Sequence, residues 1–213
     1  MISVSGKIWT EQKVNKNLVE KFKQDYGYGD ILSKLIILRN YDKSEIYGIN
    51  NKQKLINIFN KDNDFKKAYL ILVNAFNNNE NICILGDYDV DGACATSLLI
   101  RYFNHIGQKH FFYIPDRVKD GYGASKKLFQ KLILKKPKLI ILVDCGSTSN
   151  EAIDYLNKHQ VKSIIIDHHE INKPYPKSNV IINPKKEYVR KENSFLCATA
   201  LTYFFIETIN KKK

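Results

Sequence analysis

Apolar residues recur along the first 80 residues at gaps of three or four positions, which is the spacing of amphipathic helices. Two turn-forming stretches, DYGYGD at 25–30 and IYGINN at 46–51, are expected to separate these helices. We therefore predict a helical N-terminal segment over residues 1–80. The apolar positions that carry the pattern are Leu18, Phe22, Ile31, Leu32, Leu35, Ile36, Leu55, Ile58, Phe59, Ala68, Ile71, Leu72 and Ala75.

The pattern changes after the polar stretch NNNEN at 77–81, because short apolar runs then alternate with amphipathic stretches. This alternation is typical of an α/β fold, in which a parallel sheet is flanked by helices. The predicted strands span 82–86, 110–114, 139–143, 163–167 and 180–182. The predicted helices span 93–106, 124–135, 149–159 and 195–209.

Composition narrows the class of protein. A chain of 213 residues can bury a sizeable core, and its apolar runs have the length of strands rather than of membrane spans. The first residues lack the basic start and apolar middle of a signal peptide. The four cysteines are scattered and form no C-x-x-C pair, which argues against a zinc site or a disulfide scaffold and favours a reducing cytoplasm.

The chain carries a formal net charge of +12 and a pI near 9.4. Such an excess of basic residues suits an anionic partner, with nucleic acid the first choice. A genome of skewed base composition explains the abundance of Lys, Asn and Ile equally well, so the charge by itself leaves both explanations open.

Three carboxylates stand at alternate positions in the stretch DYDVDG, namely Asp87, Asp89 and Asp91. Like charges this close repel one another unless cations neutralise them, so the spacing indicates a metal site. A calcium-binding EF-hand loop is excluded, because its twelfth position needs a Glu and Leu98 stands there, and because an apolar strand rather than a helix precedes Asp87.

Two further polar groups follow predicted strands: Asp144 after 139–143, and the run Asp167, His168 and His169 at the end of 163–167. Singly, each is explained as a helix cap, a turn or a surface residue. Together they would meet the Asp triplet, because the carboxyl ends of parallel strands share one edge of the sheet. Carboxylates and imidazoles without thiolates suit Mn²⁺ or Mg²⁺.

A single divalent ion does not need this many carboxylate ligands. Two ions roughly 3.5–4 Å apart that share a bridging water would neutralise them and would hydrolyse a phosphoester.

Three segments, LGDYDVDGACATSLL, LIILVDCGSTSN and IIIDHHEI, lie in this order at strand ends. They resemble the first three motifs of the DHH phosphoesterase superfamily, and in particular its RecJ branch of 5′-to-3′ single-strand DNA exonucleases. The segment YIPDRVKDGYGAS resembles the RecJ stretch between the first and second motifs. The resemblance to RecJ implies a metal-dependent enzyme that uses Mn²⁺ or Mg²⁺ and acts in DNA repair and recombination.

The resemblance assigns roles to the residues of these motifs. It implies that Asp89 and Asp91 bind metal with Asp87 close by, that Asp144 bridges two ions, and that His168 is a further ligand. It also implies that His169 contacts the scissile phosphate and that Asp167 orients or ligates beside it. Two interpretations of the intervening segment remain level: Arg117, Gly121 and Gly123 line the path of the DNA strand, or Arg117 and Tyr122 only shape a loop.

In the family a fourth motif follows the helix predicted here at 195–209, and the printed sequence stops before it. We therefore expect residues 81–213 to form an incomplete DHH domain, without that motif or the DHH-associated domain. Three hypotheses follow: a single-stranded DNA exonuclease, with a second polypeptide as one source of the missing half; a phosphodiesterase for short oligonucleotides or cyclic dinucleotides; and a catalytically impaired module that binds nucleic acid or a protein.

Overall fold

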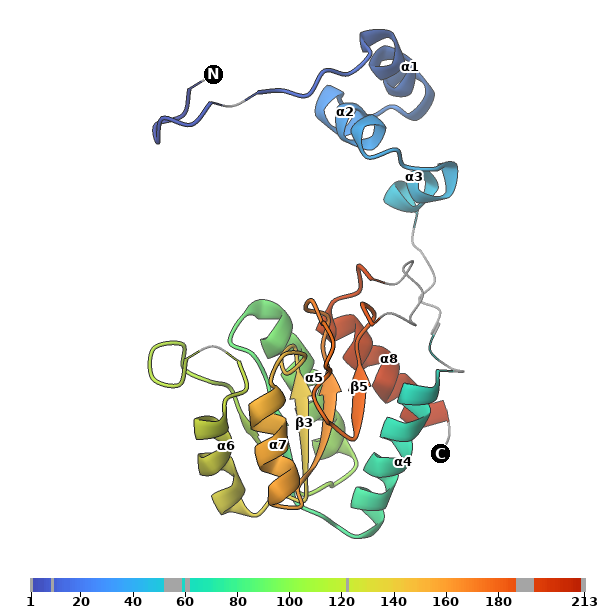
Figure 1. Ribbon diagram of the computed structural model, residues 1–213. Helices are drawn as coiled ribbons and strands as arrows, with labels where there is room; N and C mark the ends of the chain where they lie inside the picture. Colours follow the sequence, from blue (N-terminus) through green and yellow to red (C-terminus); the bar gives the residue numbers. More distant parts are fainter. Residues whose placement is uncertain are drawn as a thin grey trace. The chain divides into compact units, whose positions relative to one another are not determined.

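The computed structural model describes residues 2–8, 10–51, 59, 62–121, 123–186 and 194–211. The chain forms two compact units, residues 1–56 and 57–213. Within its described residues, the first unit contains α1 (Lys16–Tyr26), α2 (Asp30–Leu38) and α3 (Lys43–Asn50), shown in blue to cyan in Figure 1.

Local capping explains the bounds of these helices. The side chain of Asn15 accepts hydrogen bonds from the first backbone N–H groups of α1, and Gly27 ends that helix with a left-handed φ of 68°. The predicted break at 25–30 is thus confirmed.

The predicted break at 46–51 is wrong, because most of that stretch lies inside α3. Asp42 and Glu45 form a capping box that starts this helix, and Gly48 destabilises it by only about 1 kcal/mol. The predicted helical positions Leu55 and Ile58 lie outside the described residues.

The second unit is built on a parallel sheet, which confirms the predicted α/β fold class. Its strand order is β2-β1-β3-β4-β5, and every neighbouring pair is parallel. Each strand lies within a residue or so of its predicted range. The strands are β1 (Ile82–Leu85), β2 (His110–Tyr113), β3 (Leu139–Val143), β4 (Lys162–Ile166) and β5 (Val180–Ile182).

Helices cover both faces of this sheet (Figure 1). Alternate residues of β3 divide between two apolar clusters: Ile141 and Val143 join the cluster that includes α4, α5 and α8, whereas Ile140 and Leu142 join the cluster that includes α6 and α7. This double burial explains why the strands are continuous apolar runs. The helices are α4 (Asn63–Asn77), α5 (Val90–His105), α6 (Lys126–Leu132) with a 3₁₀ turn at Ile133–Lys135, α7 (Asn150–Lys158) and α8 (Ala198–Lys211).

The strand order indicates where on the sheet a functional site is expected. The chain winds outward from β1 in one direction to β2 and in the other through β3, β4 and β5, so the reversal lies between β1 and β3. In sheets of this kind, ligands bind outside the carboxyl ends of the strands at such a reversal. The reversal is flanked by β1 and β3; Asp87 comes after β1, and Asp144 comes after β3.

Candidate metal centre

Glycines hold the first motif tightly against the end of β1. A Cβ atom on Gly92 would lie 2.5 Å from the carbonyl oxygen of Asp87, and a Cβ atom on Gly86 would lie 2.0 Å from Oγ1 of Thr96. Any side chain at either position would therefore push α5 away from the strand. Asp89 begins α5 as its N-cap, because its Oδ1 accepts a hydrogen bond of 2.9 Å from the N–H of Gly92.

Asp144 stands at the centre of the site. It is 1% exposed and adopts a left-handed backbone conformation with a φ of 61°, which is costly for a residue other than glycine and recurs at functional sites. Its backbone N–H donates to the carbonyl of Ile166 at 2.9 Å, which ties the end of β3 to the end of β4. Neither of its carboxylate oxygens accepts a hydrogen bond from any residue that the structure describes.

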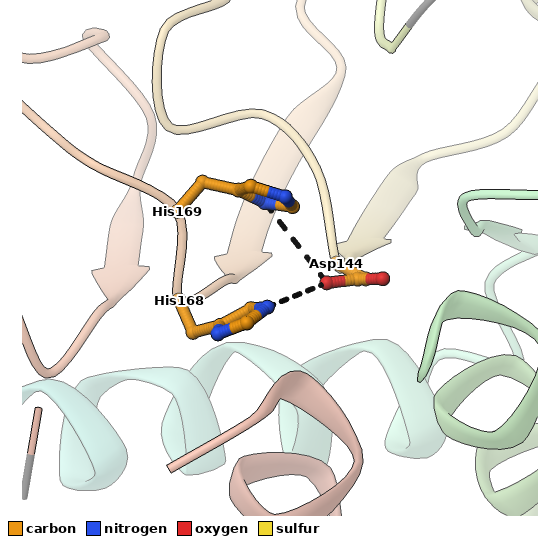
Figure 2. Close-up of side chains that lie close together, drawn as sticks. All are labelled: Asp144, His168 and His169. Carbon is orange, nitrogen blue, oxygen red and sulfur yellow. Dashed lines mark ion pairs between the residues drawn. The ribbon is translucent and has the colours of Figure 1, made fainter. Parts of the chain in front are cut away.

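Two imidazoles converge on this carboxylate, as Figure 2 shows. Nε2 of His168 lies 3.2 Å from Oδ1 of Asp144, and Nδ1 of His169 lies 3.9 Å from the same oxygen. Nε2 of His168 also lies 3.5 Å from Oδ2 of Asp91. The second and third motifs and the end of the first are therefore brought together at one point, as their positions after neighbouring strands predict.

A hydrogen-bonded carboxylate orients the second imidazole. Oδ1 of Asp167 accepts from Nδ1 of His169 at 2.8 Å, and its Oδ2 accepts from the N–H of Ser147 at 3.0 Å. Burial alone would raise the pKa of Asp167, but the hydrogen bonds from His169 and Ser147 lower it to about 2. The hydrogen bond that His169 donates to Asp167 in turn raises the pKa of His169 to about 9, so this imidazole is cationic near neutral pH.

The carboxylates of Asp144 and Asp87 receive little stabilisation of their negative charge. Burial, the side chain of Asp89 and the charge of Asp91 together raise the pKa of Asp144 to about 8. Burial is also the main reason that the pKa of Asp87 is raised. Oδ1 of Asp87 is buried and, like both oxygens of Asp144, accepts no hydrogen bond from the described part of the chain.

These features fit divalent cations. Two groups of potential ligand atoms have all members within 4.8 Å of one another: Asp87, Asp89 and Asp144 form one, and Asp144, His168 and His169 form the other. Asp144 belongs to both groups. Among the described residues, these buried carboxylate oxygens accept no hydrogen bond and are gathered with imidazoles rather than thiolates, which matches the ligands that Mn²⁺ and Mg²⁺ accept.

Asp91 is placed differently from the other two carboxylates of its motif. Its side chain accepts hydrogen bonds from the N–H of Ala198 at 2.7 Å and from the N–H of Thr199 at 2.9 Å, both at the start of α8. Burial favours the neutral acid, but the hydrogen bonds from Thr199 and Ala198 outweigh it and lower the pKa of Asp91. The carboxylate therefore stays ionised while it borders the site through His168.

The predicted substrate contacts between the first and second motifs lie in the loop that joins β2 to α6. The guanidinium of Arg117 lies 5.4 Å from the ring centroid of Tyr88, which places this loop beside the first motif. Gly121 and Gly123 have positive φ angles of 80° and 68° with open space around them, so they shape the loop. Tyr122 lies outside the described residues.

Sequence reasoning missed two residues that support the site. The side-chain amide of Asn183 donates to Oγ of Ser147 at 2.8 Å and to the carbonyl of His169 at 3.0 Å. Asn183 directly follows β5, so its place at the carboxyl edge of the sheet was a usable signal. Ser147 lies three positions after Asp144, in the loop between β3 and α7.

The N-terminal domain model of the DHH family matches residues 81–213. The chain belongs to the DHH family. Among curated relatives, it is 28% identical over 187 residues to the single-stranded-DNA-specific exonuclease RecJ of Bacillus subtilis, an alignment covering 84% of this chain and 23% of the relative. It is also 28% identical over 188 residues to a putative SPbeta prophage-derived single-strand DNA-specific exonuclease, YorK, covering 88% of this chain and 31% of the relative. The predicted resemblance to RecJ is confirmed.

Solved structures of this DHH group share the fold. An exonuclease RecJ bound to manganese superposes with a TM-score of 0.67 at 24% identity, covering 75% of this chain and 40% of the other. RecJ from Thermus thermophilus in complex with Mn²⁺ superposes with a TM-score of 0.65 at 18% identity, covering 93% of this chain and 28% of the other. In the sequence alignments with the two curated relatives named above, the chain spans less than a third of the length of each relative. Nothing in these comparisons supports a second polypeptide that completes the site.

None of the helices that the structure describes is long and apolar enough to cross a lipid bilayer.

Proposed function

We propose that this chain is the metal-binding part of a nuclease that hydrolyses phosphodiester bonds of single-stranded DNA from the 5′ end. The observation that carries the proposal is the position of Asp144, which is shared by two groups of ligand atoms and has both oxygens buried without a hydrogen bond from any described residue. The RecJ relatives, which are named single-stranded-DNA-specific exonucleases, supply the substrate class and the activity.

Each group of side chains has a distinct task. Asp87, Asp89 and Asp144 would hold one divalent ion, and Asp144 and His168 would hold a second. Bound Mn²⁺ or Mg²⁺ would supply a nucleophile from water at neutral pH and would neutralise charge that develops on the phosphate. Asp91, whose oxygens are engaged at α8, would contribute a fixed negative charge at the border of the second position.

His169 is better suited to the phosphate than to a metal ion. Its Nδ1 is engaged by Asp167, and the raised pKa of about 9 keeps the ring protonated near neutral pH. A protonated imidazole offers no lone pair to a metal but donates a charge-assisted hydrogen bond to an anion. Held in this way, His169 would contact a non-bridging oxygen of the scissile phosphate, and Arg117 beside Tyr88 would bind the neighbouring backbone.

The substrate implies a compartment that contains DNA, and we include a cytoplasmic location and a role in DNA repair and recombination in the proposal. The four cysteines, all of them described, are free thiols, which suits a reducing compartment.

The proposal is tested by incubating the purified chain with Mn²⁺ and single-stranded DNA labelled at its 5′ end. Release of labelled mononucleotide, abolished by EDTA and by Asp144→Asn but retained in Asp154→Asn, is the expected result. Asp154 is an exposed residue of α7 and serves as the matched control. Cleavage of dinucleotides alone would shift the assignment to an oligonucleotide phosphodiesterase.

The same assay separates hydrolysis from a second function, which is binding of single-stranded DNA without hydrolysis. A chain that binds single-stranded DNA in the presence of Mn²⁺ without hydrolysing it would be a DNA-binding DHH module. A chain that neither hydrolyses nor binds DNA would contradict both functions.

A further inference from the structure

The carboxylate of Asp91 caps a helix to which it does not belong. Asp91 lies in the first turn of α5, yet its two oxygens accept from the backbone N–H groups of Ala198 at 2.7 Å and Thr199 at 2.9 Å, at the start of α8. The first N–H groups of a helix have no partner within the helix and are usually satisfied by the residue just before it. Here the partner comes from more than 100 positions earlier in the chain.

The hydroxyl of Thr199 adds a second kind of contact. Its Oγ1 lies 2.5 Å from Oδ1 of Asp91 and 3.0 Å from the backbone carbonyl oxygen of the same residue. A hydroxyl that contacts both the side chain and the backbone of one residue restrains the χ1 and χ2 torsions of that side chain. The opposite oxygen, Oδ2, is the one that lies 3.5 Å from Nε2 of His168.

The two kinds of contact are separable. The N–H groups of Ala198 and Thr199 belong to the backbone, so they still cap α8 when the side chain at position 199 is replaced. Only the hydroxyl contact is lost in Thr199→Val, which keeps the shape of the side chain. The contribution of the hydroxyl to the site can therefore be measured without removing the cap.

We infer that Thr199 is a positioning residue of the metal centre: its hydroxyl fixes the carboxylate of Asp91 so that one oxygen faces His168 and the metal ligands around Asp144. The inference rests on the proposed function. Groups that hydrogen-bond to metal-site side chains typically change metal affinity by about 10–100-fold when they are removed. Losing the Thr199 hydroxyl should weaken Mn²⁺ binding by a factor in this range.

A matched control lies on the same helix. Thr202 is fully buried, three positions further along α8, and its hydroxyl has no hydrogen-bond partner among the described residues. Thr202→Val makes the same chemical change without touching Asp91. Thr199→Ser is the complementary variant, because it removes the methyl group and keeps the hydroxyl.

The test is Mn²⁺ titration of the full chain by isothermal calorimetry, with thermal unfolding of each metal-free variant as a check on folding. We expect Thr199→Val to bind Mn²⁺ about 10–100-fold more weakly than the parent chain, while Thr199→Ser and Thr202→Val stay within about threefold of it. Equal affinity in Thr199→Val and the parent would overturn the positioning role and leave the metal site standing. A parent chain that binds no Mn²⁺ would overturn both the positioning role and the proposed function.

Discussion

Replacing Asp144 by Asn should stabilise the metal-free protein and abolish its stabilisation by metal. Asp144 has no exposed side-chain surface, and its pKa rises from an ordinary value of 3.8 to about 8. The unfolded chain ionises near 3.8, so folding requires the carboxyl group either to hold its proton or to bury an unpaired charge. The resulting penalty is absent below pH 3.8, grows as the pH rises and is complete above about 8.

The size of the effect follows from this shift. Each tenfold change in an acid dissociation constant corresponds to about 1.4 kcal/mol, so the full penalty above pH 8 would be about 6 kcal/mol. Solvent and polar neighbours at the edge of the sheet screen part of it, and an Asn amide without a partner costs about 1–3 kcal/mol itself. We therefore expect a net gain of about 2 kcal/mol for metal-free Asp144→Asn at pH 8, or about 4–8 °C in melting temperature.

Scanning calorimetry in EDTA and in Mn²⁺, at pH 5 and pH 8, measures both halves of this prediction. In EDTA the advantage of Asp144→Asn should be larger at pH 8 than at pH 5. A concentration of Mn²⁺ at about 100 times its dissociation constant should stabilise the parent chain by about 2.7 kcal/mol for each ion bound and reverse the order. Asp154→Asn should follow the parent chain throughout. The reasoning is refuted if Asp144→Asn melts with the parent chain in EDTA at pH 8, or if Mn²⁺ raises the melting temperatures of both equally.

Three further predictions concern the first motif, His169 and the loop that follows β2. Gly92→Ala would place a Cβ atom 2.5 Å from the Asp87 carbonyl oxygen, so it should weaken Mn²⁺ binding at least about 10-fold by calorimetry; unchanged affinity would show that the first motif tolerates displacement of α5. Because the hydrogen bond to Asp167 raises the pKa of His169 to about 9 in the metal-free protein, DNA hydrolysis should lose the contribution of this cation at alkaline pH, and the rate profile of His169→Gln should lack that fall. The hydrogen bond from Tyr113 lowers the pKa of Asp120 to about 2, so the stability lost in Asp120→Asn should be constant above about pH 4 and should shrink as the pH falls toward 2 in urea titrations; a pH-independent difference would contradict this.

The elements of the fold were predictable where burial dominates. Strands such as β3 are buried on both faces, so they appear in the sequence as unbroken apolar runs with clear ends. Because all five strands are parallel, residues that follow them meet at one edge, and the convergence of Asp144 with His168 could be predicted from position alone. The end of α3 was not predictable from Gly48, because the capping box at its start outweighed a weak local signal.

The fine structure of the site depends on pairings that no local pattern encodes. The contact of Asp91 with Thr199 joins residues more than 100 positions apart, and a periodic apolar pattern places α8 against α5 without fixing which polar groups face each other. The same holds for Asn183, which reaches Ser147 and His169 across the ends of two strands. Their roles emerge only when the distances between side chains are known.

The central claim, that two cations share Asp144, is tested most directly by anomalous diffraction from crystals of the chain grown with Mn²⁺. The account predicts two manganese peaks at the carboxyl edge of the sheet, both within bonding distance of the Asp144 carboxylate, one beside Asp87 and Asp89 and the other beside His168. Peaks that lie elsewhere on the protein, with none in contact with Asp144, would contradict it.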